Sequence, residues 1–310
     1  MTMPERDFLS VADLTAEELE ALLDAADETK AKPSRWAERI AGRQVALIFE
    51  KPSTRTRVSF EVAVTSMGGH AVVLRGDELQ LGRGETVEDT GKVLSRYLDA
   101  IVVRTFEQER LERLASSASV PVINALSDFE HPCQALADLQ TIREAKGSLE
   151  GVALGYVGDG NNVVHSLLWA GAKSGMHVRV ASPESYMPSR AVVEQTAEVA
   201  ASTGGSVTVG NVVAEAASGA DVLYTDVWAS MGQEEESTER ARAFERFRLD
   251  REVVDLASND VIVMHCLPAH RGEEISAEVI DGPRSVVWDQ AENRLHSQKA
   301  LLDWLLNADD

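Results

Sequence analysis

The chain has 310 residues, about twice the commonest domain size, and a hydrophobic fraction of 44%, which predicts two folded domains and excludes a disordered protein. No apolar run approaches the roughly 20 residues of a membrane-spanning helix, so no membrane partner is expected. The 51 acidic and 30 basic residues give a net charge of -21, which repels phosphate backbones and argues against nucleic acid as a partner.

The first residues and the cysteines indicate a compartment. The opening segment MTMPERDFLSVADL has acids where a signal peptide requires a basic flank and an apolar core, so we expect a cytoplasmic location. Cys133 and Cys266 are the two cysteines, each beside a His and in separate halves of the chain, which predicts reduced thiols rather than a disulfide.

Carboxylates dominate the charged residues, and Lys is scarce beside Arg. This composition resembles that of proteins from a high-salt cytosol. The alternative interpretation is an ordinary acidic protein encoded by GC-rich DNA. In either case the charge concerns solubility and not the fold.

Apolar, β-rich runs alternate with helical patterns along the chain, which is typical of parallel α/β architecture. In the first half we expect strands at 43–49, 70–74, 100–104 and 120–124. The helices between them are expected at 53–68, 86–98 and 107–117. In the second half we expect strands at 152–157, 177–181, 206–209, 221–225, 261–265 and 286–288.

The two sets are connected by a helix expected at 132–146, and the segment EAKGSLEG at 144–151 has the charge, Gly and Ser content of a hinge. We therefore expect two doubly wound parallel-sheet α/β domains, residues 1–146 and 147–310. The amphipathic tail QKALLDWLLN predicts a C-terminal helix, about residues 290–307, that packs back on the first domain.

The first strand is followed by KPSTRTR at 51–57 and an amphipathic helix. Ligands of parallel sheets lie beyond the carboxyl ends of the strands. A phosphate cradle is predicted by the N–H groups of a helix N-terminus, the hydroxyls of Ser53, Thr54 and Thr56, and the charges of Arg55 and Arg57. The alternative is a helix cap followed by solvated arginines, but two Arg in a first turn oppose the helix dipole.

The segment PSTRTR before VSFE resembles the carbamoyl phosphate loop of the aspartate and ornithine carbamoyltransferases. Three further segments continue the resemblance: LQLGRGE at 79–85, VVRTF at 102–106 and HPCQALADL at 131–139. Together they imply a set of carbamoyl phosphate-binding residues, namely Ser53, Thr54, Arg55, Thr56, Gln80, Arg104, His131, Gln134, Cys266, Leu267 and Arg294.

The chemistry of carbamoyl transfer suits these residue types, because the carbonyl must be polarised and the leaving phosphate neutralised. The resemblance implies that Arg55 binds the phosphate and that Arg104 bridges the phosphate and the carbonyl oxygen. It also implies that His131 donates to that oxygen and that Gln134 holds the carbamoyl NH2. Taken alone, His131 has a helix cap as its alternative interpretation, and the 79–86 loop has a surface turn.

The second half opens with GYVGDGNN, which reads G-x-x-G-x-G where a dinucleotide fingerprint needs G-x-G-x-x-G. Two amides at a helix start suit an amino-acid carboxylate. The segment resembles the ornithine-binding segment of the family, which implies Asn162 and, secondarily, Asn161. An NAD site is the alternative.

Two later segments resemble the ornithine rather than the aspartate enzymes. DVWASMG at 226–232 implies Asp226, Ser230 and Met231 as ornithine contacts, while a helix cap is the alternative for Asp226. HCLPAHRGEE at 265–274 implies that Cys266 and the Leu267 carbonyl contact the attacking amine. Without the resemblance, a Cys beside a His suggests a thiol nucleophile or a metal ligand, but adjacent strand residues face opposite sides and no spaced ligand pair is present.

The resemblance spans nearly the whole chain and implies transfer of the carbamoyl group to the δ-amine of L-ornithine, giving L-citrulline and phosphate. Arg104, His131, Asp226 and Cys266 are then the catalytic set, with Asp226 and Cys266 or the leaving phosphate accepting the amine proton. It implies no metal, no organic cofactor and a homotrimer or a multiple of one. The alternatives are a transferase for putrescine or an acylated ornithine, an NAD-dependent hydroxy-acid dehydrogenase, and a non-catalytic binding paralogue.

Overall fold

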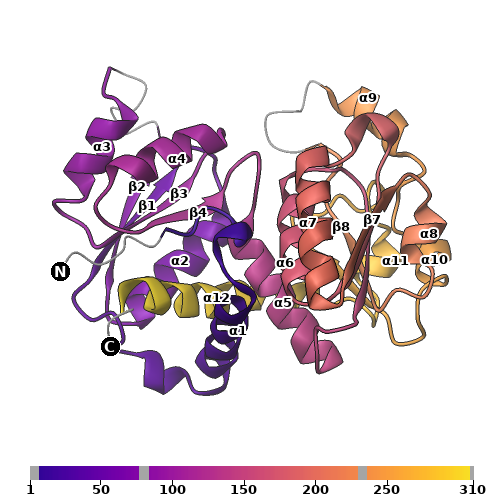
Figure 1. Cartoon of the computed structure of the whole chain (residues 1–310), viewed down its shortest axis with the longest axis horizontal. Helices are drawn as coiled ribbons and strands as arrows, with labels where there is room; N and C mark the ends of the chain where they lie inside the picture. The colour runs from indigo at the N-terminus through magenta and orange to yellow at the C-terminus, as the bar shows by residue number, and fades with distance from the viewer. Residues whose placement is uncertain (1–6, 77–83, 230–235, 308–310) are drawn as a thin grey trace. The chain divides into compact units, whose positions relative to one another are not determined.

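The computed structural model describes residues 7–76, 84–229 and 236–307 (Figure 1). The chain forms two compact units, residues 1–137 together with 293–310, and residues 138–292. The division falls inside helix α5, Pro132–Lys146, whereas the sequence led us to expect it after this helix. Among the described residues, no helix is both long and apolar enough to cross a membrane.

The first unit contains a parallel sheet in the order β2-β1-β3-β4. Its strands are β1 Gln44–Phe49, β2 His70–Arg75, β3 Ala100–Arg104 and β4 Val122–Leu126. The apolar runs of β1, β3 and β4 are almost completely buried, as expected where helices cover both faces of a parallel sheet. The helices are α1 Ala16–Ala31, α2 Thr54–Ser66, α3 Val87–Leu94 and α4 Gln108–Ser117, with short 3-10 helices at Val11–Asp13 and Pro33–Trp36.

The C-terminal helix α12, Val287–Leu306, belongs to the first unit from Asn293 onward. It packs beside α1, where the Thr29 hydroxyl donates to the His296 carbonyl at 3.2 Å (Figure 1). Arg39 makes a bidentate ion pair with Asp303, at 2.6 and 2.8 Å. The expected return of the tail to the first half of the chain is therefore confirmed.

The second unit contains a parallel sheet in the order β7-β6-β5-β8-β9. Its strands are β5 Ala153–Val157, β6 His177–Ala181, β7 Ser206–Gly210, β8 Val222–Thr225 and β9 Ile262–His265. The helices are α6 Asn162–Lys173, α7 Arg190–Thr203, α8 Val213–Ala217, α9 Ser237–Phe244, α10 Arg251–Val254 and α11 Ala277–Ile280, with a 3-10 helix at Glu184–Tyr186. In Figure 1, α6 and α7 lie on one face of the sheet, and α8, α10 and α11 lie on the other.

One expected strand, at 286–288, is wrong. Residue Ser285 makes a single bridge to Val263, and helix α12 begins two residues later at Val287. The apolar run is too short to continue the sheet, and the following DQAENR is polar and favours a helix start. Trp288 is 64% exposed, which a central strand position would not allow.

The strand orders place the functional loops. In the first sheet the strand order reverses between the parallel neighbours β1 and β3, and in the second between β5 and β8, because successive strands are added first on one side and then on the other. Such switch points leave a crevice at the carboxyl ends of the strands, where the loops on either side diverge. The segments at 50–57 and 104–105 border the first crevice, and those at 158–162 and 226–229 border the second.

Candidate active site

The loop after β1 ends in the N-terminus of α2. Ser53 is the N-cap residue, and its hydroxyl accepts from the Thr56 backbone N–H at 3.2 Å. Thr54 and Arg55 in the first turn are exposed, and Thr56 is buried. The cap and the phosphate cradle are compatible, because capping occupies only one N–H group. The other N–H groups of the first turn and the positive end of the helix dipole stay available to an anion.

Four buried or half-buried side chains gather beside this helix start. Arg294, from α12, donates to the Gln134 Oε1 at 2.7 Å and to the Thr56 hydroxyl at 3.1 Å. Gln134 lies in the first turn of α5, and this helix begins directly after His131. Arg104 ends β3 at the same edge of the sheet. Residues from four elements thus converge although 238 positions separate the Thr56 and Arg294 partners.

His131 is neutral in this setting. Burial holds its pKa well below 6.5, and the positive charges of Arg294, Arg104 and Arg55 lower it further. Three guanidinium groups thus disfavour the protonated form of one imidazole by charge repulsion. A neutral imidazole among cations can donate a hydrogen bond to a developing oxyanion while it keeps its proton.

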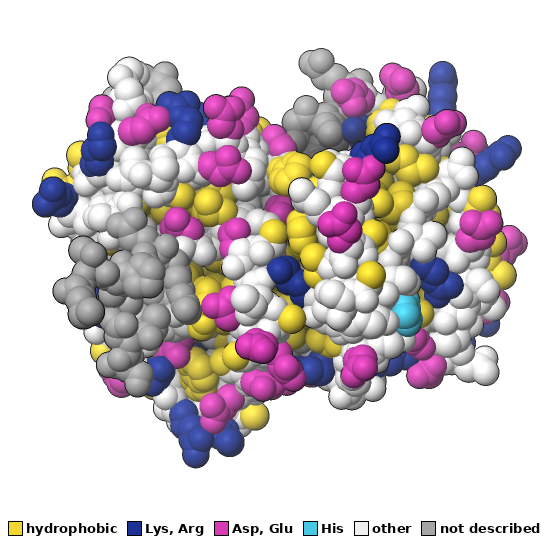
Figure 2. All heavy atoms as spheres, viewed as in Figure 1, with side chains coloured by type: hydrophobic (Ala, Val, Ile, Leu, Met, Phe, Trp, Pro, Cys, Tyr) yellow, Lys and Arg dark blue, Asp and Glu magenta, His cyan; other side chains and the backbone are white. Residues whose placement is uncertain are grey.

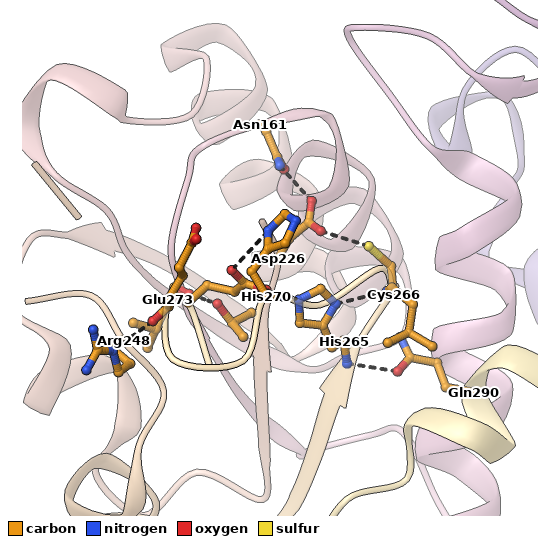
Figure 3. Close-up of polar contacts among 12 residues, drawn as sticks. Asn161, Asp226, Arg248, His265, Cys266, His270, Glu273 and Gln290 are labelled. Atoms are coloured by element: carbon orange, nitrogen blue, oxygen red, sulfur yellow. Dashed lines mark hydrogen bonds and ion pairs between the residues drawn. The ribbon is translucent and has the colours of Figure 1, made fainter. Parts of the chain in front are cut away.

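In the second unit, Asp226 follows β8 and is 5% exposed (Figure 3). The Asn161 amide donates to its Oδ2 at 2.8 Å, and the Cys266 thiol donates to its Oδ1 at 3.0 Å. Asn161 is also the N-cap of α6, since its Oδ1 accepts from the Val163 and Val164 backbone N–H groups. The three expected residues Asn161, Asp226 and Cys266, which come from three different strand ends, therefore form one hydrogen-bonded chain.

The glycine-rich turn before α6 packs against protein. A Cβ on Gly160 would lie 2.2 Å from the Pro188 backbone nitrogen, and the Gly160 N–H donates to the Tyr186 carbonyl at 2.8 Å. This glycine is explained by a close approach of two chain segments, so it gives no support to a dinucleotide site.

The remaining expected residues are distributed as follows. Asn162 is the first residue of α6 and half-buried, and Leu267 follows Cys266 with its side chain against the core of the second unit. Cys266 and Leu267, expected among the carbamoyl phosphate contacts, belong to the second unit, whereas the other described members of that set belong to the first. Gln80, Ser230 and Met231 lie outside the described residues.

Two groups within the described part of the chain bring potential metal ligands within 4.8 Å of one another, namely Asp226, His265 and Cys266, and His270, Glu273 and Glu274. In the first group the His265 Nδ1 accepts from the Leu267 N–H at 2.9 Å and Nε2 faces Glu274 at 3.1 Å. Both ring nitrogens are engaged within the protein, so the ring presents no lone pair to an ion. In the second group Glu274 already accepts from the His270 N–H at 2.6 Å.

Two buried polar pairs were not predicted from the sequence. Arg240 donates to Asp159 and to the Trp228 carbonyl, both at 2.9 Å, and its guanidinium lies 4.7 Å from the centre of the Tyr186 ring. His265 and Glu274 form the other pair. Arg240 ends the acidic run QEEESTER at 233–240, and its only sequence signal is that it is the single base in this run.

Cys133 is not part of the proposed site. Burial raises the pKa of its thiol to about 12, and the thiol donates to the Asn124 carbonyl at 3.3 Å. It is a packing residue at the start of α5. Neither cysteine forms a disulfide.

Comparison with known proteins agrees with this geometry. The family model "Aspartate/ornithine carbamoyltransferase, carbamoyl-P binding domain" matches residues 6–144, and "Aspartate/ornithine carbamoyltransferase, Asp/Orn binding domain" matches residues 150–305. The chain therefore belongs to the aspartate/ornithine carbamoyltransferase family.

Within the family, similarity is high to proteins named ornithine carbamoyltransferase. That of Parafrankia sp. is 63% identical, covering 98% of this chain and 97% of that protein. The structure of ornithine carbamoyltransferase from Pyrococcus furiosus has a TM-score of 0.95 and 52% identity, covering 100% of this chain and 99% of that one. A mutant N-acetyl-L-ornithine transcarbamylase is less similar, with 31% identity, a TM-score of 0.87, and coverage of 97% of this chain and 99% of that one.

Proposed function

We propose that this chain is a carbamoyltransferase that moves the carbamoyl group of carbamoyl phosphate to the δ-amine of L-ornithine, giving L-citrulline and phosphate. The observation that carries the proposal is the opposite charge of its two sites. A helix start and three arginines around neutral His131 suit a phosphate dianion, and the Asp226–Cys266 pair suits an amine.

In the first unit, Arg55 and the α2 N-terminus bind the phosphate, together with Ser53, Thr54 and Thr56. Arg104 reaches both the phosphate and the carbonyl oxygen, and His131 donates to that oxygen as its charge develops. Arg294 uses one lone pair of the Gln134 Oε1, and a carbonyl oxygen can accept a second hydrogen bond, here from the carbamoyl NH2.

In the second unit, Asn161 and Asn162 lie at the start of α6 and suit the ornithine carboxylate, while Asp226 and Cys266 receive the δ-amine. The neutral amine attacks the carbonyl carbon, and the carbon–oxygen bond to phosphate breaks. The proton lost by the nitrogen passes to Asp226 and Cys266 or to the departing phosphate. Free alkyl ammonium groups have a pKa of about 10.4, so the site must favour the neutral amine. Gln80, Ser230 and Met231 complete the proposed contacts.

The direct test is citrulline formation from carbamoyl phosphate with a panel of acceptors. We expect turnover with L-ornithine and little with putrescine, N-acetyl-L-ornithine or aspartate. Preference for N-acetyl-L-ornithine would instead indicate an activity like that of the N-acetyl-L-ornithine transcarbamylase. The absence of any carbamoyl transfer would contradict the proposal.

We also propose a homotrimer, or a multiple of one, in which the 79–86 loop reaches a neighbouring subunit. A surface depression of about 1050 Å³ adjoins Ser53 and Thr54, and α2 exposes Val58 and Val62 beside it. Mixing inactive Gln80→Ala and Arg55→Ala subunits should restore activity if loop and cradle come from different chains. A fully active monomer in light scattering would contradict the assembly.

The composition supports two further proposals, a cytoplasmic location and adaptation to high salt. The thiols are unbridged, as in a reducing compartment, and the net charge of -21 suits concentrated cations.

A further inference from the structure

The loop after β9 is held at its start by a buried pair that the proposed chemistry does not use. His265 and Glu274 are both 0% exposed. The His265 Nδ1 accepts from the Leu267 backbone N–H at 2.9 Å, so the ring proton is on Nε2, which donates to the Glu274 Oε1 at 3.1 Å. The same oxygen accepts from the His270 backbone N–H at 2.6 Å. One carboxylate therefore ties both the beginning and the middle of the 265–274 loop.

Leu267, whose N–H donates to the His265 ring, has an unfavourable backbone conformation. Leu267 has a φ of 60°, and it is the one non-glycine residue with positive φ in the described part of the chain. The left-handed region costs a branched residue about 1–2 kcal/mol, so the surrounding contacts must hold it there. The contacts present are the His265 ring on the N–H of Leu267 and the core of the second unit on its side chain.

The neighbouring side chain is the thiol of the proposed site. Cys266 lies between His265 and Leu267, and its Sγ contacts Asp226 at 3.0 Å (Figure 3). The conformation of Leu267 sets the direction of its own carbonyl and limits the direction of the Cys266 side chain. Any loosening of Leu267 therefore displaces both groups that face the amine.

We propose that His265 and Glu274 are positioning residues, an inference that rests on the proposed function. The His265 ring is a fixed acceptor for the Leu267 N–H, and Glu274 fixes the tautomer and orientation of the ring. His265 does not take the proton of Cys266 or of ornithine, because the lone pair of Nδ1 is occupied and Nε2 carries the proton. This assignment distinguishes a scaffold from a Cys–His–Glu proton relay built of the same residues.

Paired variants separate these two roles. Glu274→Gln keeps an oxygen for the His265 and His270 donors and removes the charge, whereas Glu274→Ala removes both. His265→Asn puts an oxygen near the position of Nδ1 and has no basic nitrogen, whereas His265→Ala removes the acceptor. We expect the Gln and Asn variants to retain most of the kcat/KM for ornithine. The two Ala variants should lose about 100-fold, the cost of misplacing a reacting group by about 1 Å.

Two further measurements do not depend on ornithine turnover. Carbamoyl phosphate binding, measured by calorimetry, should fall far less than the kcat/KM for ornithine in the two Ala variants, because most of its described contacts lie in the first unit and only Cys266 and Leu267 lie in the second. The rate at which an alkylating reagent modifies Cys266 should rise in the Ala variants and not in the Gln and Asn variants. Cys133, which is 0% exposed, provides little background.

The proposal is overturned if Glu274→Gln is as impaired as Glu274→Ala, or His265→Asn as impaired as His265→Ala, since charge or ring basicity would then be required. It is also overturned if the Ala variants have parental kinetics and parental thiol reactivity. Failure of the parent enzyme to form citrulline would instead refute the proposed function, and the alkylation rates would still report whether the pair holds the loop.

Discussion

The charge of Arg55 affects both the α2 helix dipole and the protonation of His131. It lies in the first turn of α2, where its charge opposes the helix dipole, and its positive charge also helps to keep His131 neutral. The phosphate dianion that we propose for this site offsets both effects. The proposed ligand, rather than stability, accounts for an exposed arginine at this position.

We expect Arg55→Ala to lower kcat/KM for carbamoyl phosphate by about 100-fold, equivalent to about 3 kcal/mol, because a charge-assisted phosphate contact strengthens as the leaving group departs. Initial-rate kinetics with each substrate varied in turn measures this loss. Arg35→Ala is the control, since Arg35 is exposed, is paired with Glu28 and is not among the proposed contacts. Parental turnover in Arg55→Ala would show that the cradle is assigned to the wrong residue.

Asp226 is the anion of the proposed acceptor site. Its two oxygens accept from Asn161 and from Cys266, so an anion is held close to the position proposed for the δ-amine. An aspartate site needs bases at this place. The residue thus bears on the choice of acceptor more than on carbamoyl phosphate.

Asp226→Asn keeps the shape of the side chain and removes the anion. We expect kcat/KM for ornithine to fall by at least about 3 kcal/mol, or roughly 100-fold, while carbamoyl phosphate binding stays within error. Cys266→Ser should lose less, because a hydroxyl still contacts the amine and no covalent intermediate is proposed. Asp255→Asn, at an exposed carboxylate paired with Arg251, is the control. Equal use of ornithine by the parent and by Asp226→Asn would contradict the assignment.

At the scale of elements, helix α9 is fastened to the turn before α6 by one ion pair. Arg240, in α9, contacts Asp159, which is 81 residues away in sequence, and also the Trp228 carbonyl after β8. Burial raises the pKa of Asp159 to about 6 even though Arg240 lowers it. The pair therefore supports both loops that carry Asn161 and Asp226.

Arg240→Met should destabilise the protein in a pH-dependent way. Without the guanidinium the pKa of Asp159 rises above about 6, while in the unfolded chain it is about 3.9. A raised folded-state pKa gives stability at low pH that is lost as the pH rises through that value. The loss in free energy of unfolding should therefore be larger at pH 8, about 3 kcal/mol, than at pH 5.

Urea unfolding of the variant and the parent at the two pH values provides the comparison. Arg242→Met, at an exposed position of the same helix, is the matched control and should change little at either pH. A penalty that shrinks from pH 5 to pH 8 would show that Asp159 is not the partner whose charge Arg240 compensates.

At the scale of the molecule, the net charge of -21 acts on the whole fold. Asp and Glu side chains are spread over the visible face of both units rather than gathered in one patch (Figure 2). Their repulsion opposes compact structure and weakens as salt shortens the screening length, from about 30 Å at 0.01 M to about 3 Å at 1 M.

We therefore expect the thermal midpoint and the activity to rise with KCl from 0.01 M to 1 M. Scanning calorimetry and citrulline assays across this series measure the effect. Sucrose at matched osmotic strength is the control, because it stabilises compact states without screening charge. Full stability and activity after dialysis into dilute buffer would contradict the adaptation to high salt.

The alternation of apolar runs and helical patterns was sufficient to predict the parallel architecture and most strand positions. It also indicated which polar segments follow β1, β5, β8 and β9, because side chains that follow parallel strands must emerge at one edge of a sheet. Their role as binding sites stays a prediction. The run at 286–288 misled the prediction, since three apolar residues are compatible with a strand or with a helix start.

Local sequence signals therefore determined which segments are strands and which polar residues follow them. Only the tertiary structure decided which of those residues meet. The neighbours β5, β8 and β9 bring Asn161, Asp226 and Cys266 together, and the return of α12 brings Arg294 to Gln134. The pairs Arg240–Asp159 and His265–Glu274 likewise depend on burial, which removes water and requires each charged or polar group to find a partner, a condition that depends on the packed fold and not on spacing along the chain.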